Sequence, residues 1–245
     1  QNMIGSDVIP SHHTTPDSLE LMRLFDKMAE EGVNSVVMEV SSHSLALDRV
    51  ASCTFDVGAF TNVTQDHLDF HITMENYIDA KAILFKKCGI GVFNIDDDAY
   101  ESLSLGCGCN VLTYSAKTKA DLWAQNIEYR ATGVEFDLNY KDESERVSLA
   151  IPGGFSVYNS LTAISVVNNL GYALEDVIKA AFNAKSVSGR VECIFAIAQR
   201  SICITSYATA MGIVCREERC DREIDKHLVT YQVGYILHTH IVGLH

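Results

Sequence analysis

The stretch NSVVMEVSSHS, residues 34–44, decides how this chain folds. Its apolar residues, mostly β-branched, predict a buried strand over 34–40, which Glu39 interrupts near the end. A second apolar strand is expected over 55–61, and it ends at Asn62. Polar side chains directly after buried strands predict a site at one edge of a sheet.

Helices are expected between and after these strands. Thr15 is the predicted N-cap of a helix that runs to about Glu31, with Pro16 at its first position and Asp17 favoured by the helix dipole. Apolar periodicity predicts a further helix over 74–87 and a strand over 90–94. The last two expected helices span 156–170 and 174–184.

Residues 110–150 have a different pattern, with short alternating runs, Gly133, and a charged turn at 141–146. This pattern is typical of antiparallel hairpins. Together with the alternation of strands and helices, it predicts an α/β fold: a mostly parallel sheet flanked by helices, with a small antiparallel β subregion. From Ser206 onward the helix and strand patterns weaken. We hypothesise that this tail is a frameshifted or misassembled end, a hypothesis that resequencing of the source would test.

Composition narrows the class of function. The 245 residues carry a net charge of −13, which argues against binding to nucleic acid or to an anionic membrane surface. The sequence has no signal peptide pattern and no apolar run near the ~18 residues of a membrane-spanning helix. The eight cysteines form no CxxC pair and are expected to be reduced, buried and cytosolic.

The polar turn after the first strand offers oxygen donors from Glu39, Ser41 and Ser42, which suit Mg²⁺. A plain capping role at the strand end explains these residues equally well. The segment TNVTQDHLDFH, residues 61–71, is denser in polar groups. It is either an Asx-rich turn before a helix or a hydrolytic metal centre built from Asp66, His67 and His71, and spacing alone does not separate the two.

Lys81 lies inside the expected helix 74–87. A lysine in a helix is usually a solvated surface group. If its surroundings are buried, however, the amine loses its charge readily. A neutral amine can take up CO₂ as a carbamate, which is an anionic oxygen ligand for a metal.

Several blocks in order along the chain closely resemble the MurE-type Mur ligases, over about residues 1–205. The blocks are TTPDSLEL (14–21), MEVSSH (38–43), FTNVTQDHLDFH (60–71), AK followed by LF (80–85), IPGGFSVYNSLTA (151–163) and SGRVE (188–192). The first block is typical of the MurE type rather than of other Mur ligases or of folylpolyglutamate synthetases.

The resemblance implies a cytoplasmic, ATP-dependent amide ligation in peptidoglycan synthesis. ATP would phosphorylate the D-Glu carboxylate of UDP-MurNAc-L-Ala-D-Glu, and a diamino acid, meso-diaminopimelate or L-lysine, would attack the acyl phosphate. Mg²⁺ would neutralise charge during phosphoryl transfer. No nucleic acid or membrane partner is implied.

The resemblance also implies roles for individual residues. Glu39 and His67 are similar to Mg²⁺ ligands, and Lys81 to a carbamylated lysine that acts with His67 at the catalytic centre. The residues similar to contacts with the UDP-MurNAc-dipeptide are Thr14, Thr15, Ser41 and Arg49. Those similar to ATP contacts are Asn159 and Arg190.

The chain departs from the family in two places. It has no phosphate-binding Gly-Lys-Thr loop, and after Glu192 it keeps only the Tyr-Ala of the block that opens the family's C-terminal domain. We therefore expect residues 1–192 to be a partial central ATPase domain without its phosphate-loop strand. Residues 193–245 are expected to be a truncated or divergent start of the ligase domain, and the isolated fragment is expected to be inactive. The alternatives are a non-catalytic remnant that binds Mg²⁺ or muropeptide, and a metal-dependent hydrolase.

Overall fold

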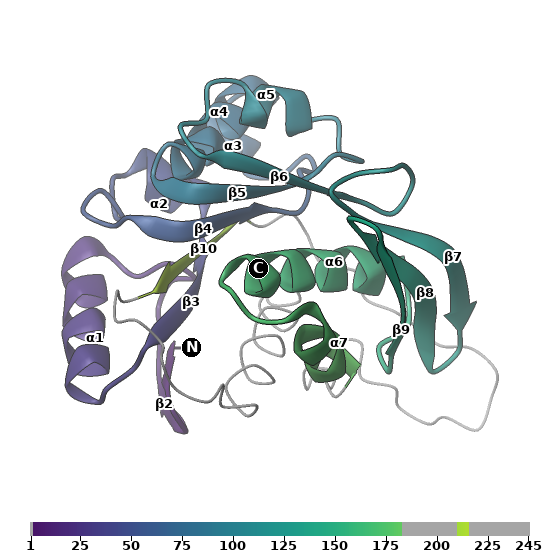
Figure 1. Ribbon diagram of the computed structural model, residues 1–245. Helices are drawn as coiled ribbons and strands as arrows, with labels where there is room; N and C mark the ends of the chain where they lie inside the picture. The colour runs from purple at the N-terminus through teal and green to yellow at the C-terminus, as the bar shows by residue number, and fades with distance from the viewer. Residues whose placement is uncertain (1, 183–209, 216–245) are drawn as a thin grey trace, which may run out of the picture.

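The computed structural model describes residues 2–182 and 210–215. An eight-stranded sheet forms its centre, in the order β3-β10-β4-β5-β6-β7-β8-β9, and β1 and β2 form a separate hairpin (Figure 1). The strands are β1 Asn2–Ile4, β2 Asp7–Ile9, β3 Ser35–Val40, β4 Phe55–Phe60, β5 Cys88–Asn94, β6 Asn110–Ser115, β7 Leu122–Arg130, β8 Gly133–Tyr140, β9 Glu143–Leu149 and β10 Ala210–Cys215. The helices are α1 Ser18–Glu30, α2 Ser42–Ala46, α3 Leu68–His71, α4 Met74–Phe85, α5 Tyr100–Ser104, α6 Gly154–Asn169 and α7 Leu174–Phe182.

The parallel part of the sheet confirms the predicted α/β class. Strands β4, β5, β6 and β7 pair in parallel; helices connect β4 to β5 and β5 to β6, and a loop connects β6 to β7. Strand β10 lies between β3 and β4 and is antiparallel to both. No strand was predicted in that part of the chain, so the sequence interpretation is wrong for residues 210–215.

The antiparallel subregion is smaller than predicted. Strands β7, β8 and β9 form an antiparallel meander, as expected. Residues 110–115, however, form β6, a parallel strand between β5 and β7, so the hairpin prediction is wrong there. Local alternation reports which face of a strand is buried, but it does not report the direction of the strand's partner.

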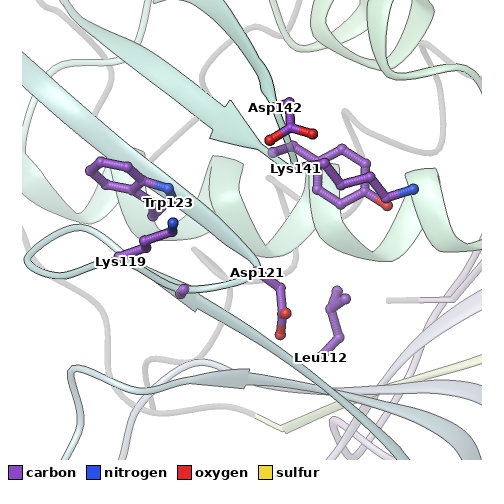
Figure 2. A pocket seen from close by; sticks show the side chains of 8 residues that line it. Leu112, Lys119, Asp121, Trp123, Lys141 and Asp142 are labelled. Atoms are coloured by element: carbon purple, nitrogen blue, oxygen red, sulfur yellow. The ribbon is translucent and has the colours of Figure 1, made fainter.

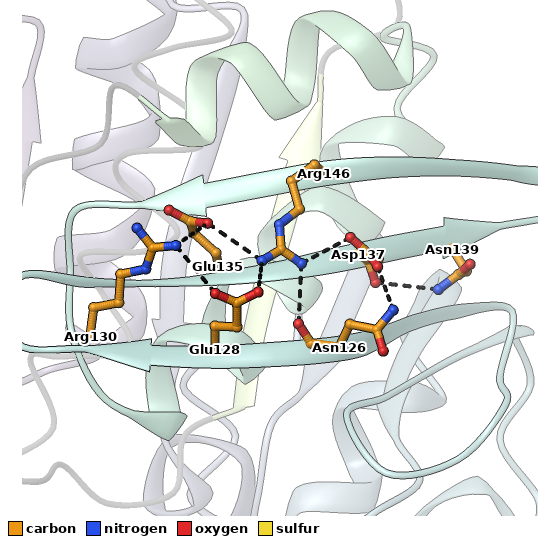
Figure 3. Close-up of polar contacts among 7 residues, drawn as sticks. All are labelled: Asn126, Glu128, Arg130, Glu135, Asp137, Asn139 and Arg146. Carbon is orange, nitrogen blue, oxygen red and sulfur yellow. Dashed lines mark hydrogen bonds and ion pairs between the residues drawn. The ribbon is translucent and has the colours of Figure 1, made fainter.

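An ion-pair network covers one face of this meander (Figure 3). The Arg146 guanidinium lies 2.7 Å from a Glu128 carboxylate oxygen and 3.0 Å from Asp137, and Arg130 lies 2.9 Å from Glu135. These side chains are exposed or half-exposed, and exposed pairs of this kind stabilise a fold only modestly. We interpret the network as a solvated outer face of the meander.

Helices cover both faces of the sheet (Figure 1). Helices α4 and α5 lie on one face, and α6 and α7 lie on the other. Each layer has its own core. Leu84, Phe85 and Phe93 are fully buried on the α4 side, and Leu161 and Ile164 on the α6 side. The sheet therefore lies between two well-packed layers, one on each face.

The start of α1 differs from the prediction. Asp17 is the N-cap, and its carboxylate accepts hydrogen bonds from the backbone N–H groups of Leu19 and Glu20 at 3.1 and 2.9 Å. Thr15 was the predicted cap and is not, because its hydroxyl is bonded to the end of β3 instead. The helix otherwise begins and ends within about two residues of its predicted bounds.

The division of the chain at residue 192 stays a prediction. Strand β10, from beyond that residue, lies in the same sheet as the strands before it. Within the described residues, no helix is long and apolar enough to cross a membrane.

Candidate functional site

Hydrogen bonds link the loops that follow β4 and β5 at the carboxyl ends of the central strands. The Asn94 side-chain amide, at the end of β5, donates to the Thr61 carbonyl just after β4, at 2.7 Å. The Val63 backbone N–H donates to the Asp97 carboxylate at 3.0 Å. These bonds hold the loops after β4 and β5 together, as expected for the ends of adjacent parallel strands.

Lys81 is buried beside this edge. Its side chain is 2% exposed, and its ammonium nitrogen lies 4.8 Å from the centre of the Tyr77 ring. Burial lowers the pKa of Lys81 to about 8, although the negative charges of Glu39, Asp66 and Asp97 act in the opposite direction. A substantial fraction of this amine is therefore neutral near physiological pH, which the sequence interpretation required for a carbamate.

Glu39 and His67 reach the same place from two other segments. The charge of Glu39, near the end of β3, acts on both Lys81 and Tyr77 of α4. The His67 ring centre lies 6.0 Å from that of Tyr77, and its Nε2 is 3.6 Å from an Asp66 carboxylate oxygen. His67 and Lys81, far apart in the chain, thus both adjoin the Tyr77 ring, and Glu39 acts on this group through its charge.

Two further histidines adjoin this group. The His43 ring centre lies 4.9 Å from His67 and 5.4 Å from His71. His71 is buried, and its Nε2 shares a 2.9 Å hydrogen bond with the Ser42 hydroxyl. Burial lowers the pKa of both His43 and His71, and neighbouring histidines lower it further, so both rings stay neutral near pH 7.

The hydrolase alternative finds no support in this geometry. Among residues 2–182 and 210–215, no three His, Cys, Asp or Glu side chains are arranged to hold a metal ion. His71 is directed to the Ser42 hydroxyl rather than to a shared site with Asp66 and His67.

Three of the four predicted substrate contacts meet beside Glu39. The Thr15 hydroxyl donates to the Glu39 carbonyl at 2.9 Å and accepts from the Ser41 backbone N–H at 3.0 Å. The Arg49 guanidinium donates to the Thr15 carbonyl at 3.1 Å. Thr14 is exposed beside this group. Thr15 is fully buried, so its side chain supports the residues around it and is not itself accessible to a ligand.

Of the two predicted ATP contacts, Asn159 lies on α6, on the other side of the sheet from Lys81. Its neighbour Tyr158 donates a 3.0 Å hydrogen bond to the Asp96 carboxylate, which anchors the first half of α6 to the loop after β5. Arg190 lies outside the described residues.

Sequence reasoning missed Tyr77 and Asp97 as members of the site. Tyr77 was expected only as part of the apolar stripe of its helix, and it is fully buried. Asp97 follows β5 as Asn62 follows β4, so its position after a predicted strand was the signal that could have identified it.

A separate hollow of about 320 Å³ lies over the loop between β6 and β7 (Figure 2). Trp123, Tyr140 and two lysines line it, and the Lys141 ammonium lies 4.8 Å from the Tyr140 ring centre. Its Asp121 carboxylate is engaged by the backbone N–H and the hydroxyl of Thr113. None of the predicted site residues lines this hollow.

The donor set around Lys81 suits a hard divalent cation. Mg²⁺ keeps several waters and takes only one or two protein carboxylates besides phosphate oxygens, so a sparse set is sufficient. Glu39 would supply one carboxylate oxygen, His67 an imidazole nitrogen and a carbamylated Lys81 another oxygen. The buried amine with a lowered pKa is the observation that fits this arrangement.

The family model described as the Mur ligase middle domain matches residues 1–167. Two similar proteins are named UDP-N-acetylmuramoyl-L-alanyl-D-glutamate--2,6-diaminopimelate ligase. The one from Caldanaerobacter subterraneus subsp. tengcongensis is 50% identical over 193 residues, 78% of this chain and 40% of the relative. The one from Clostridium acetobutylicum, numbered 1 in that organism, is 47% identical over 79% of this chain and 40% of its own length. The chain thus spans about 40% of the length of these relatives.

Solved structures agree on the fold. The structure of a UDP-N-acetylmuramoyl-L-alanyl-D-glutamate--2,6-diaminopimelate ligase superposes with a TM-score of 0.66 and 28% identity, over 73% of this chain and 38% of that one. The MurF ligase from Thermotoga maritima in complex with ADP superposes with a TM-score of 0.52 and 22% identity, over 62% of this chain and 35% of that one. At that identity the likeness concerns the fold alone.

Proposed function

The chain belongs to the Mur ligase family, and on that premise we propose that it carries the central part of an ATP-dependent amide ligase. The proposed reaction adds a diamino acid to UDP-MurNAc-L-Ala-D-Glu through an acyl phosphate, in the cytoplasm. The names of its relatives favour 2,6-diaminopimelate over L-lysine as that amino acid.

One observation carries this proposal: His67 and the buried Lys81 both adjoin Tyr77, and the charge of Glu39 acts on Lys81 and on Tyr77. A bound Mg²⁺ would supply charge neutralisation for phosphoryl transfer. Glu39 would hold and orient it from the end of β3, and His67 from the residue before α3. Lys81 would contribute as a carbamate: its neutral amine bonds to the carbon of CO₂ and releases one proton.

The surface beside Glu39 fits the acidic, nucleotide-linked dipeptide. Arg49 brings a fixed positive charge there, and its bond to the Thr15 carbonyl holds the segment before α1 against β3. Thr14 and Ser41 would present hydroxyls to the substrate. Asn159 and Arg190 remain the proposed ATP contacts.

Binding can be tested on the 245-residue chain itself. Calorimetric titration with UDP-MurNAc-L-Ala-D-Glu in the presence of Mg²⁺ is expected to show saturable binding. Thr14→Ala should weaken it about tenfold, because a hydrogen bond to a charged group contributes ~1.5–3 kcal/mol. Thr132→Ala, an exposed threonine in the turn between β7 and β8, is the matched control and should bind as the unaltered chain does.

Chemistry needs the phosphate-binding loop, which these 245 residues do not contain. We therefore expect no ATP turnover by the chain alone. The test is a chimera in which the matched 193 residues replace their counterpart in the Caldanaerobacter relative. It should ligate diaminopimelate, and Lys81→Ala should abolish that activity.

The possible outcomes separate the candidate functions. A folded chimera that binds the UDP-linked dipeptide but forms no product would instead support a non-catalytic binding role. A chain that neither binds the dipeptide nor supports ligation in the chimera would refute the proposal.

A further inference from the structure

Three cysteines that take no part in the proposed ligation lie together on the α4 side of the sheet. Cys88 is the first residue of β5, and Cys107 and Cys109 lie in the loop between α5 and β6. Cys88 is buried, and the other two are half-buried. We refer to these three residues as the thiol cluster.

Two glycines make room for the sulfurs. Gly58 of β4 and Gly91 of β5 are partners in the parallel register, so their missing side chains lie on the same face. A Cβ at Gly58 would lie 3.0 Å from the Cys88 sulfur, and a Cβ at Gly91 would lie 2.8 Å from the Cys109 sulfur. The two sulfurs thus occupy neighbouring places above adjacent strands.

The thiols also interact with one another. Cys107 and Cys109 pack against the core that contains Cys88, and both Cys88 and Cys107 contribute to the raised pKa of Cys109. The Cys107 sulfur lies 4.0 Å from the Cys109 carbonyl oxygen. Thiols that lie this close together can exchange disulfide bonds with one another.

We propose that the thiol cluster is a site of reversible oxidation by low-molecular-weight disulfides, entered at Cys107 and closed as a Cys88–Cys109 bridge. The Cys107 thiolate attacks one sulfur of the small disulfide, forms a mixed disulfide and releases one small thiolate. Cys109 then attacks the Cys107 sulfur, its proton passes to the second small thiolate, and a Cys107–Cys109 bridge forms. Cys88 attacks the Cys109 sulfur in turn and restores the Cys107 thiol. Two protein thiols are oxidised, and one small disulfide is reduced to two thiols.

Burial lowers the rate of disulfide exchange among the three thiols, whereas their proximity raises it. Burial raises the pKa of Cys88 and of Cys109, so only a small fraction of each thiol is a thiolate. Their direct reaction with small disulfides is therefore slow. Because the three side chains pack in one core, the exchange among them is unimolecular, which compensates for a low thiolate fraction. The cluster therefore reacts with the small disulfide at Cys107, and the bridge forms between the two thiols whose pKa is raised.

The bridge would tie the start of β5 to the loop before β6. Cys88 directly follows the turn that ends α4, the helix that carries Lys81. The bridge would restrain the junction between α4 and β5, and this effect does not depend on the proposed ligation.

Mass spectrometry after treatment with glutathione disulfide tests the proposal. Trypsin leaves residues 88–117 in one peptide, because no Lys or Arg lies between Lys87 and Lys117, and a Glu-specific protease then cuts after Glu101. After alkylation of free thiols, we expect one alkyl group, on Cys107, and the two halves still joined through Cys88 and Cys109. Halves that separate, or a peptide with three alkyl groups or with bound glutathione at all three sites, would overturn the proposal.

Single variants test the order of events. Cys109→Ser should abolish the link between the halves, and Cys107→Ser should slow its formation at least about tenfold, because the proposed entry thiol is lost. Cys53→Ser removes a buried thiol outside the cluster and should leave the rate unchanged. An unchanged rate in Cys107→Ser would show that Cys107 is not the entry point.

Discussion

The hydroxyl of Thr15 donates a 2.9 Å hydrogen bond to the backbone carbonyl of Glu39, across 24 residues of sequence. The same hydroxyl accepts from the Ser41 backbone N–H. Through these two bonds, the segment before α1 is held against the end of the strand that carries the proposed metal ligand.

Thr15→Val should destabilise the protein by about 1–3 kcal/mol, because it removes both bonds at a fully buried position while it keeps the side chain's shape. Urea unfolding measures the loss. Thr15→Ser keeps the hydroxyl and is the matched control. If Thr15→Val and Thr15→Ser lower the free energy of unfolding equally, the hydrogen bonds of the hydroxyl do not account for the stability.

Lys81→Met should change how stability depends on pH. The pKa of Lys81 is about 8 in the folded protein, against 10.5 ordinarily. Between these values the unfolded chain binds a proton that the folded protein does not, so the free energy of unfolding rises with pH. The unaltered protein should gain roughly 3 kcal/mol relative to Lys81→Met across this window. Lys86→Met, at the exposed end of α4, is the control, and parallel curves for all three proteins would contradict the burial of the charge.

Carbamylation of Lys81 should require Mg²⁺. A carbamate would place a negative charge near Glu39, Asp66 and Asp97, which is unfavourable without a divalent cation. With ¹³C-bicarbonate, we expect a carbamate carbon signal by NMR only when Mg²⁺ is present, and no such signal in Lys81→Met. A signal of equal strength without Mg²⁺ would argue against a shared metal site.

Acid should destabilise the fold through His43 and His71. Burial lowers the pKa of His43 and of His71 in the folded protein, so below about 6.5 the unfolded chain binds protons that the folded protein resists. Stability should therefore fall as pH drops below this value, and less steeply in His71→Gln. Thermal unfolding across this range is the measurement, with His12→Gln, an exposed site, as the control. An equal slope in His71→Gln would exclude His71 as a source of the acid sensitivity.

Deletion of β10 should uncover two strand edges. Strand β10 pairs with both β3 and β4, so its loss leaves backbone donors and acceptors of both strands without ladder partners. A chain that ends at residue 209 should be less stable and more prone to self-association than one that ends at residue 215. Urea unfolding and light scattering compare the two, and identical behaviour would mean that β10 contributes nothing to the sheet.

Much of the fold could be predicted because its signals are local. Short runs rich in apolar residues predicted both β3 and β4, one within residues 34–40 and one within 55–61. Helix periodicity likewise predicted α4 and α6 within about two residues at most ends. The parallel pairing of β6 and the insertion of β10 depend on partners distant in the chain, so local patterns did not predict them.

By itself the sequence determined the alternation of strands and helices, the polar residues at the strand ends and the family's blocks. The tertiary structure alone decided which of these residues meet. It buries Lys81 against Tyr77, places Glu39 and His67 beside it, and lowers the pKa of the amine. The physical reason is that desolvation and charge–charge interactions depend on distance in space, and a helical lysine has the same local sequence pattern whether it faces water or the core.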